Sequence, residues 1–338
     1  MKKYFLLLIF SCKLINAQVI GGKSTFAFLN SPLNARVAGL GGELVSQRNE
    51  DPNLMRYNPA SGNYKMNKTA SVNYMSFVSG INLYNSNFVY AKDSTSMVWG
   101  GNISYLNYGN IDSYDEAGNA MGSFHARDYS ITASAAKKLG NYSIGANLGL
   151  ANSKLSTYTA TAVYADLGGQ FIHPKKDITI GLLIKNIGFN IDNYTKGNKE
   201  SLPVDVQAGT TFKPKFMPIR FNFTLHHLYK SDISYYDPYN KAYTDQDADF
   251  KNTKPSTLEK ALRHADIGIE ALVAKGFNVR AGYSFMRRQD LKFQSGSSNW
   301  AGFSCGAMIK IKKFTAEYSQ VFYHSAASKG ILSLSYKI

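Results

Sequence analysis

Short segments that alternate apolar and polar residues run through this chain from Thr69 to its last residue. In Ile219–His226 every second residue from Ile219 is apolar and the residues between are polar, and Val204–Lys213 shows the same alternation. Successive side chains of a β-strand point to opposite faces, so each segment has one face suited to lipid and one suited to water. The pattern predicts an all-β fold, a transmembrane antiparallel β-barrel.

The alternating segments indicate about fourteen strands, an even number, as in single-chain bacterial barrels. Strands are predicted near residues 69–77, 81–91, 96–107, 127–138, 142–153, 159–172, 178–187, 202–213, 219–229, 264–273, 277–287, 299–311, 314–321 and 328–338.

The connections between these strands alternate in length. Very short ones, such as 139–141, 274–276 and 312–313, fall at every second junction, as periplasmic turns do in barrels whose termini both face the periplasm. One junction departs from this rule, because the first outer connection, 78–80, is also very short. The parity predicts an integral, multi-pass protein of the cell outer membrane with both termini periplasmic. The long outer connections are 108–126, 188–201, 230–263 and 288–298.

Composition agrees with a single membrane barrel. Mean hydropathy is −0.25, and no apolar run approaches the roughly 20 residues that a membrane helix needs. The chain carries 23 Tyr and 20 Phe, enough for aromatic girdles at both membrane interfaces. If the chain crosses a membrane, it must do so as a closed β-sheet, because only helices and closed barrels satisfy every backbone hydrogen-bonding group in lipid.

The first residues predict secretion. Lys2 and Lys3 precede the apolar stretch Tyr4–Phe10, and Ala17 offers a small residue for cleavage, as in a secretory signal peptide. The predicted division is a signal peptide at 1–17, an N-terminal hatch or plug at 18–68, and an outer-membrane β-barrel at 69–338. The plug segment lacks sustained alternation and is broken by Gly and Pro, and a barrel of about fourteen strands has room for it in the lumen.

The positive charge of the chain does not indicate a nucleic-acid-binding protein. The formal net charge is +15, and loss of Lys2, Lys3 and Lys13 with the signal peptide lowers it to +12, from 35 basic and 23 acidic residues. No nucleic-acid-binding motif accompanies the charge. Many lysines instead fall at the predicted periplasmic turns, near anionic phospholipid headgroups.

Three motifs in the plug segment carry a resemblance. Ala35–Gly42 reads ARVAGLGG, Asp51–Asn53 reads DPN and Asn58–Ala60 reads NPA. In this order they are similar to the hatch signature of the FadL-like outer-membrane barrel superfamily, and within it to the PorQ and PorV barrels of type IX secretion. Gly21–Leu29 and Phe124–Tyr129 resemble the same PorQ-like branch. The hatch residues that the resemblance marks as structural are Arg36, Gly39, Gly41, Gly42, Asp51, Asn58, Pro59 and Ala60.

The resemblance implies a role in type IX protein secretion. Such barrels belong with PorU, PorV and PorZ to the attachment complex at the cell surface, which processes cargo and attaches it to anionic lipopolysaccharide. The expected function is an outer-membrane anchor for that complex, with PorZ as the most plausible contact. The wider superfamily leaves a second class open, a transporter of long-chain fatty acids or other hydrophobic small molecules. That class needs an apolar pocket and a lateral wall opening, and the glycines of 99–101 and 167–169 are candidates for a strand kink.

The largest outer connection is the candidate partner-binding loop. Tyr235, Tyr236, Tyr239 and Tyr243 are aromatic anchors of the kind enriched at interfaces, although they also suit packing on the barrel mouth. Ser256–Glu259 reads as a capping box that opens a short helix through Arg263.

No enzymatic, cofactor or metal site is expected. Gly302–Gly306 matches the G-x-S-x-G pattern, but that pattern needs a strand-to-helix turn, and here it lies inside a predicted strand with Ser304 toward the lumen. The acidic stretch Asp245–Asp249 lacks the Gly and Glu of an EF-hand, which leaves open only looser calcium binding. His226 and His227 are adjacent and should point to opposite faces of a strand.

Charged residues on the polar face of the wall form a further hypothesis. Arg36 in the plug is expected to pair with one of the wall carboxylates and so to stabilise the hatch. The wall charges are Asp166, Asp205, Arg220, Glu270, Arg280 and Glu317.

Overall fold

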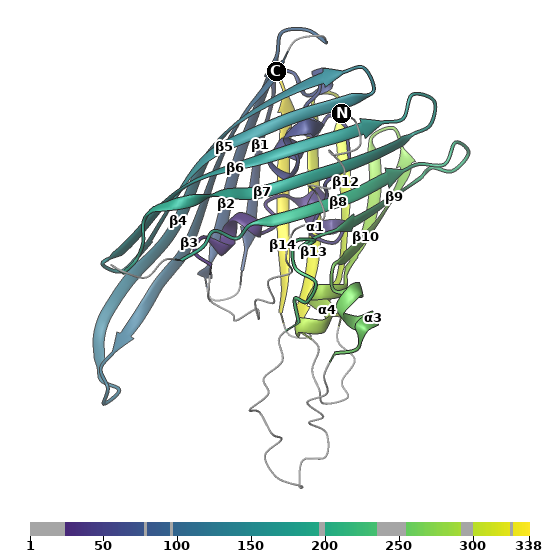
Figure 1. Cartoon of the computed structure of the whole chain (residues 1–338). Helices are drawn as coiled ribbons and strands as arrows, with labels where there is room; N and C mark the ends of the chain where they lie inside the picture. The colour runs from purple at the N-terminus through teal and green to yellow at the C-terminus, as the bar shows by residue number, and fades with distance from the viewer. Residues whose placement is uncertain are drawn as a thin grey trace, which may run out of the picture.

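The residues that the computed structural model describes form a closed barrel of fourteen antiparallel strands (Figure 1). These residues are 24–77, 80–94, 97–195, 200–234, 255–291, 300–324 and 327–338. Each strand pairs with its neighbours in sequence, and β1 (Thr69–Ser76) closes the barrel by pairing with β14 (Ala327–Lys337). The others are β2 (Asn82–Ala91), β3 (Val98–Tyr114), β4 (Ala120–Leu139), β5 (Tyr142–Leu155), β6 (Tyr158–Ile172), β7 (Ile178–Asp192), β8 (Asp205–Phe212), β9 (Ile219–Leu225), β10 (Ala265–Ala274), β11 (Phe277–Ser284), β12 (Phe303–Ile311) and β13 (Phe314–His324).

The predicted fold class is confirmed, and the alternation identified all fourteen strands. In β5, Ile144, Leu148 and Leu150 are more than half exposed on the outside, whereas Ser143 and Asn147 are buried on the inside. An exposed apolar side chain between buried polar ones is the arrangement of a strand with lipid outside and a polar lumen inside. The outer surface is therefore suited to a bilayer on every side.

Aromatic side chains gather at both ends of the apolar band. Tyr74 and Tyr84 lie at one end with ring centroids 5.3 Å apart, and Tyr142 lies 5.3 Å from Phe171 at the other. Membrane barrels carry a girdle of aromatic residues at each membrane interface, so an aromatic cluster is expected at both ends of the apolar band.

The outer connection predicted at 108–126 is wrong for most of its length. β3 and β4 continue as a paired ribbon past Asn107, with only 115–119 as the turn between them. The ribbon carries polar residues on both faces because it extends beyond its neighbours, so the alternation that marks a lipid-facing strand is absent there. The predicted strand 277–287 is also too long, because it ends at Ser284 and passes into helix α4 (Phe285–Leu291).

The two ends of the barrel differ in their connections. At one end the strands are joined by turns such as 140–141, 275–276 and 312–313, and Thr69 lies beside Lys337. At the opposite end lie α4 and α3 (Thr257–Leu262), which Figure 1 shows below the barrel. The N-cap half of the predicted capping box is present there, since the Ser256 hydroxyl accepts a hydrogen bond from the backbone N–H of Glu259.

Residues 24–68, the described part of the chain before β1, lie inside the barrel, where Figure 1 shows their short helices enclosed by the strands. Among the described residues, no helix is long and apolar enough to cross a membrane. From Thr25 to Gly62 most side chains are buried, so this segment acts as a plug that fills the lumen. Its elements are η1 (Ala27–Asn30), α1 (Ala35–Gly39), α2 (Leu54–Tyr57), η2 (Pro59–Ser61) and η3 (Tyr64–Met66).

Candidate functional site

Arg36 joins the plug to the wall by pairing with two carboxylates of the wall and one of the plug. It lies in α1, where Asn34 caps the helix by accepting a hydrogen bond from the backbone N–H of Val37. Its Nε donates to Asp51 in the plug at 3.0 Å, and its two terminal nitrogens lie 2.7 Å from Glu270 on β10 and from Glu317 on β13. The planar guanidinium suits this geometry, because its donors point in fixed, separate directions.

Two wall arginines complete this cluster, which we call the Arg36 cluster. Arg220 lies 2.6 Å from Glu270, and Arg280 lies 2.8 Å from Glu317 and 3.6 Å from Glu270. Three guanidinium groups thus face three carboxylates, Asp51, Glu270 and Glu317, in a buried site. Burial lowers the pKa of Arg36, but the charges of Glu317, Glu270 and Asp51 more than offset this, so its pKa is raised and the group stays charged.

Asp51 also shapes the turn before α2, which contacts β1 and β2 through Asn53. One carboxylate oxygen accepts from the backbone N–H and side-chain amide of Asn53, at 3.0 and 2.7 Å. The side-chain oxygen Oδ1 of Asn53 in turn accepts from three wall side chains, Ser71, Asn73 and Asn87, at 2.6 to 3.0 Å. The sequence identifies the DPN motif, but it does not predict that Asn53 contacts the wall.

The motif Asn58–Ala60 packs on glycines of the wall. The Asn58 amide donates to the Val45 carbonyl at 2.7 Å, and its oxygen accepts from the Ala60 N–H at 3.0 Å. Gly145 on β5 lies so close that a Cβ there would be 2.5 Å from the carbonyl carbon of Pro59 and 2.6 Å from the nitrogen of Ala60. A Cβ at Gly168 on β6 would overlap the Asn58 oxygen. Glycine therefore lets the plug backbone approach the wall.

The glycines of the first motif serve the same purpose from the plug side. Gly39 lies against Ser319 of β13, where a Cβ would be 2.5 Å from the hydroxyl oxygen. Gly41 and Gly42 have φ of 115° and 120°, a region that L side chains rarely adopt. This backbone brings the Gly41 carbonyl 2.7 Å from Arg287 of α4.

An apolar cluster fills another part of the lumen. Phe26, Phe28 and Leu29 of the plug pack in one hydrophobic core with wall side chains, among them Leu83 and Ile331. Tyr57 holds the plug's own loop, since its hydroxyl accepts from the backbone N–H of Leu33 at 2.5 Å. The plug therefore has both polar and apolar contacts with the wall.

A second polar cluster, which the sequence did not predict, lies around Glu43. Gln207 on β8 donates to Glu43 at 2.9 Å and to Asp205 at 2.7 Å. Lys185 on β7 is only 2% exposed. Burial raises the pKa of Glu43, and the charge of Lys185 opposes that shift.

The prediction that His226 and His227 point to opposite faces is wrong. β9 ends at Leu225, and His227 has φ of 56°, which breaks the alternation. The two Nδ1 atoms lie 2.7 Å apart as a result. Within the described part of the chain, no group of three or more His, Cys, Asp or Glu side chains is arranged to hold a metal ion.

The other sequence candidates are placed as follows. Tyr235, Tyr236, Tyr239 and Tyr243, and the acidic stretch 245–249, lie outside the described residues. Gly302 is not in a strand as predicted but in a turn with φ of 93°, directly before β12. Ser304 is buried toward the lumen, as expected.

The glycines at 99–101 and 167–169 do not end their strands. β3 and β6 run through both, and Gly100 and Gly168 face the plug. The wall ladder is interrupted elsewhere, at β7. Its pairing with β8 stops at Lys185–Asp205, and Asn186 has φ of 57°. Beyond this point β7 continues to Asp192 beside residues 200–203 and the plug, where the Asn186 amide donates to the Pro203 carbonyl at 2.9 Å.

These features define an outer-membrane type of β-barrel whose lumen holds an N-terminal plug. No protein-family model and no curated protein matches this chain. Solved structures of similar fold include the toluene transporter TbuX of Ralstonia pickettii, with 11% identity, a TM-score of 0.51 and coverage of 95% of this chain and 100% of that one.

Two structures of TodX are also similar. A TodX deletion mutant, described as a monoaromatic hydrocarbon channel, has 9% identity and a TM-score of 0.53, and the match covers 90% of this chain and 99% of that chain. The P. putida toluene transporter TodX has 11% identity and a TM-score of 0.50, covering 92% and 99%. At these identities the likeness shows the fold alone, a closed barrel with an N-terminal segment before its first strand.

Proposed function

We propose that this barrel is an outer-membrane anchor of type IX protein secretion, which holds the cell-surface complex that processes cargo and attaches it to lipopolysaccharide. The observation that carries this proposal is the fixed position of the plug. Each of the three motifs that resemble the hatch of PorQ-like barrels contacts the wall, through Arg36, Asn53 and Asn58 respectively. A plug held by buried ion pairs suits a scaffold, since a scaffold needs a rigid, closed wall and no passage.

The proposed partners are PorZ, PorU and PorV-like components, with anionic lipopolysaccharide at the surface. The end of the barrel that carries α3 and α4 is proposed to face the cell exterior, and both termini the periplasm. Contact with PorZ is assigned to the connection between β9 and β10, which contains Tyr235, Tyr236, Tyr239 and Tyr243. Tyr side chains give large contact areas with little loss of conformational entropy.

Removal of residues 235–255 should leave the barrel intact and abolish capture of the surface partner. β9 and β10 pair directly from Ala265–Leu225 onward, so the wall does not depend on the deleted residues. The measurement is co-purification of the attachment-complex proteins with the tagged barrel after detergent extraction, beside heat-modifiable migration as the check of folding. A matched control removes Glu116–Gly118 from the turn between β3 and β4. Unchanged capture by the first variant would refute the assignment of the loop.

A channel for long-chain fatty acids or other hydrophobic small molecules is the second candidate. The solved structures favour it over the first, because TbuX and TodX are toluene transporters and share the fold. Within this chain, the interrupted ladder between β7 and β8 is the observation that supports it. An apolar compound that moves from the lumen into the bilayer needs an opening between two strands of the wall.

A further inference from the structure

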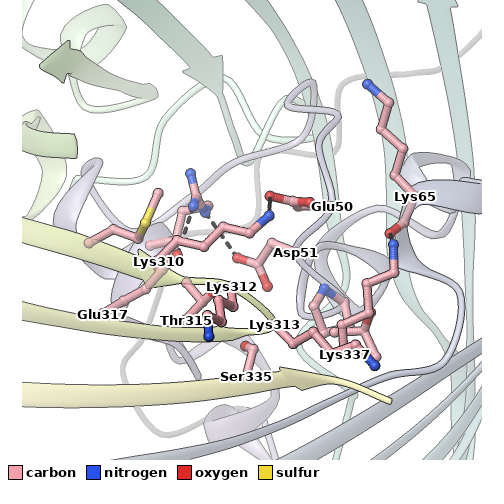
Figure 2. Close-up of a pocket in the computed structure, with 14 residues that line it drawn as sticks. Glu50, Asp51, Lys65, Lys310, Lys312, Lys313, Thr315, Glu317, Ser335 and Lys337 are labelled. Atoms are coloured by element: carbon pink, nitrogen blue, oxygen red, sulfur yellow. Dashed lines mark hydrogen bonds and ion pairs between the residues drawn. The ribbon is translucent and has the colours of Figure 1, made fainter. Parts of the chain in front are cut away.

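A hollow opens between the plug and the wall at the end of the barrel that carries the short turns. Its volume is about 130 Å³. The ends of β12, β13 and β14 form one side, and residues 50–52 and Lys65 of the plug form the other (Figure 2). A single water needs roughly 10–15 Å³ of such space, so the hollow has room for a polyatomic group. We call it the basic hollow.

Cations outnumber anions in its lining. The lining contains three acidic residues, Glu50, Asp51 and Glu317, and six basic residues, so it carries an excess of three positive charges. The six are Arg36, Lys65, Lys310, Lys312, Lys313 and Lys337.

The carboxylates are already neutralised by direct partners. Arg36 pairs with Asp51 and Glu317, and Lys310 pairs with Glu50, as the dashed lines in Figure 2 mark. No ion pair within the described residues involves Lys65, Lys312, Lys313 or Lys337, although Lys337 donates to the Lys65 carbonyl at 3.3 Å. Three lysines of the wall, Lys312, Lys313 and Lys337, therefore line the hollow with no ion pair to a carboxylate in the described part of the chain.

Like charges gathered at one rim of the lumen repel one another, and a multivalent anion between them relieves the repulsion. The three lysines come from the wall, whereas the Lys65 side chain points away from the hollow in Figure 2 and its backbone carbonyl accepts from Lys337. Lysine is a compact point charge that suits the oxygens of a phosphate. The Thr315 and Ser335 hydroxyls also line the hollow and are able to donate hydrogen bonds.

We propose that the basic hollow binds a phosphate group, which bridges the plug and the wall. Anionic phospholipid headgroups and free phosphate are the two sources of that chemistry at a membrane rim. This site is independent of the partner loop at the other end of the barrel, and it holds for either candidate function.

The test compares two triple variants of equal charge. Lys312→Gln/Lys313→Gln/Lys337→Gln removes the three positive charges of the wall that line the hollow and have no ion pair among the described residues. Lys137→Gln/Lys138→Gln/Lys175→Gln removes the same charge from other turns of the same rim, where the lysines line no part of the hollow. Both sets of lysines are exposed, so folding should survive in each. Heat-modifiable migration checks that it does.

Two probes separate the sources. Inorganic phosphate is titrated into the detergent-solubilised protein by calorimetry, and native mass spectrometry counts retained phosphatidylglycerol against phosphatidylcholine. The first variant should bind the effective probe at least about tenfold more weakly than wild type, while the second stays within about twofold. Binding of inorganic phosphate identifies a free phosphate, and selective retention of phosphatidylglycerol alone identifies a headgroup. If wild type binds neither probe, or both variants lose binding equally, the proposal is overturned.

Discussion

Replacement of Arg36 by Ala should release the plug from the wall. The change removes one of three guanidinium groups from a buried cluster of three carboxylates and leaves Asp51 with no cation at ion-pair distance. Removal of one member of a buried ion-pair cluster typically costs about 3–5 kcal/mol, because the remaining charge stays buried. Backbone amides of α1 should therefore exchange with solvent roughly a hundredfold to several thousandfold faster. Hydrogen–deuterium exchange with mass spectrometry measures this directly.

Two further variants make the Arg36 result specific. Lys310→Ala breaks another plug-to-wall pair, with Glu50, but one whose side chains are 31% and 50% exposed, so its effect should stay within about 1 kcal/mol. Arg36→Lys keeps the charge but loses the three-way geometry, and it should fall between wild type and Arg36→Ala. Exchange in α1 that is equal for Arg36→Ala and wild type would show that the cluster does not hold the plug.

Replacement of Gly145 by Ala should displace the Asn58–Ala60 motif from the wall. The new Cβ would lie 2.5 Å from the Pro59 carbonyl carbon and 2.6 Å from the Ala60 nitrogen, so backbone atoms must move. Overpacking of this kind costs about 1–3 kcal/mol. The expected result is faster amide exchange in 58–62 with the barrel strands still protected.

Gly169→Ala is the matched control for this prediction. Gly169 lies on the adjacent strand, directly opposite Ile144, and a Cβ there meets nothing within 4 Å. The control should leave exchange in the plug unchanged. Equal exchange in the Gly145 and Gly169 variants would mean that the wall glycines are not there to admit the plug.

The strands could be predicted from the sequence because lipid outside and polar groups inside impose a period of two on each of them. Where that constraint ends, prediction failed. The ribbon of β3 and β4 beyond Asn107 has solvent on both faces, so its polar residues predict a loop where the structure has a strand pair. α4 was missed because the alternation of apolar and polar residues continues past Ser284 to Phe285.

The site was predictable in outline only. Arg36 was expected to pair with a wall carboxylate because a buried guanidinium needs one. Which carboxylates it would find was not accessible, since Glu270 and Glu317 lie 234 and 281 residues away in the sequence. Asn53 and Lys185 were overlooked for the same reason, as their roles depend on the register between distant strands. The contact of His226 with His227 depends on the positive φ of His227, which no local sequence pattern predicts.

Deletion of the gene from the native host, with wild-type complementation, tests the proposed function most directly. The readout is the state of proteins that carry the type IX C-terminal signal, followed in parallel with uptake of a long-chain fatty acid and of toluene. An anchor of the attachment complex predicts uncleaved cargo in the periplasm, restored to the surface by the wild-type gene, with uptake unchanged. Normal cargo processing together with a loss of uptake would contradict the proposal and identify a channel.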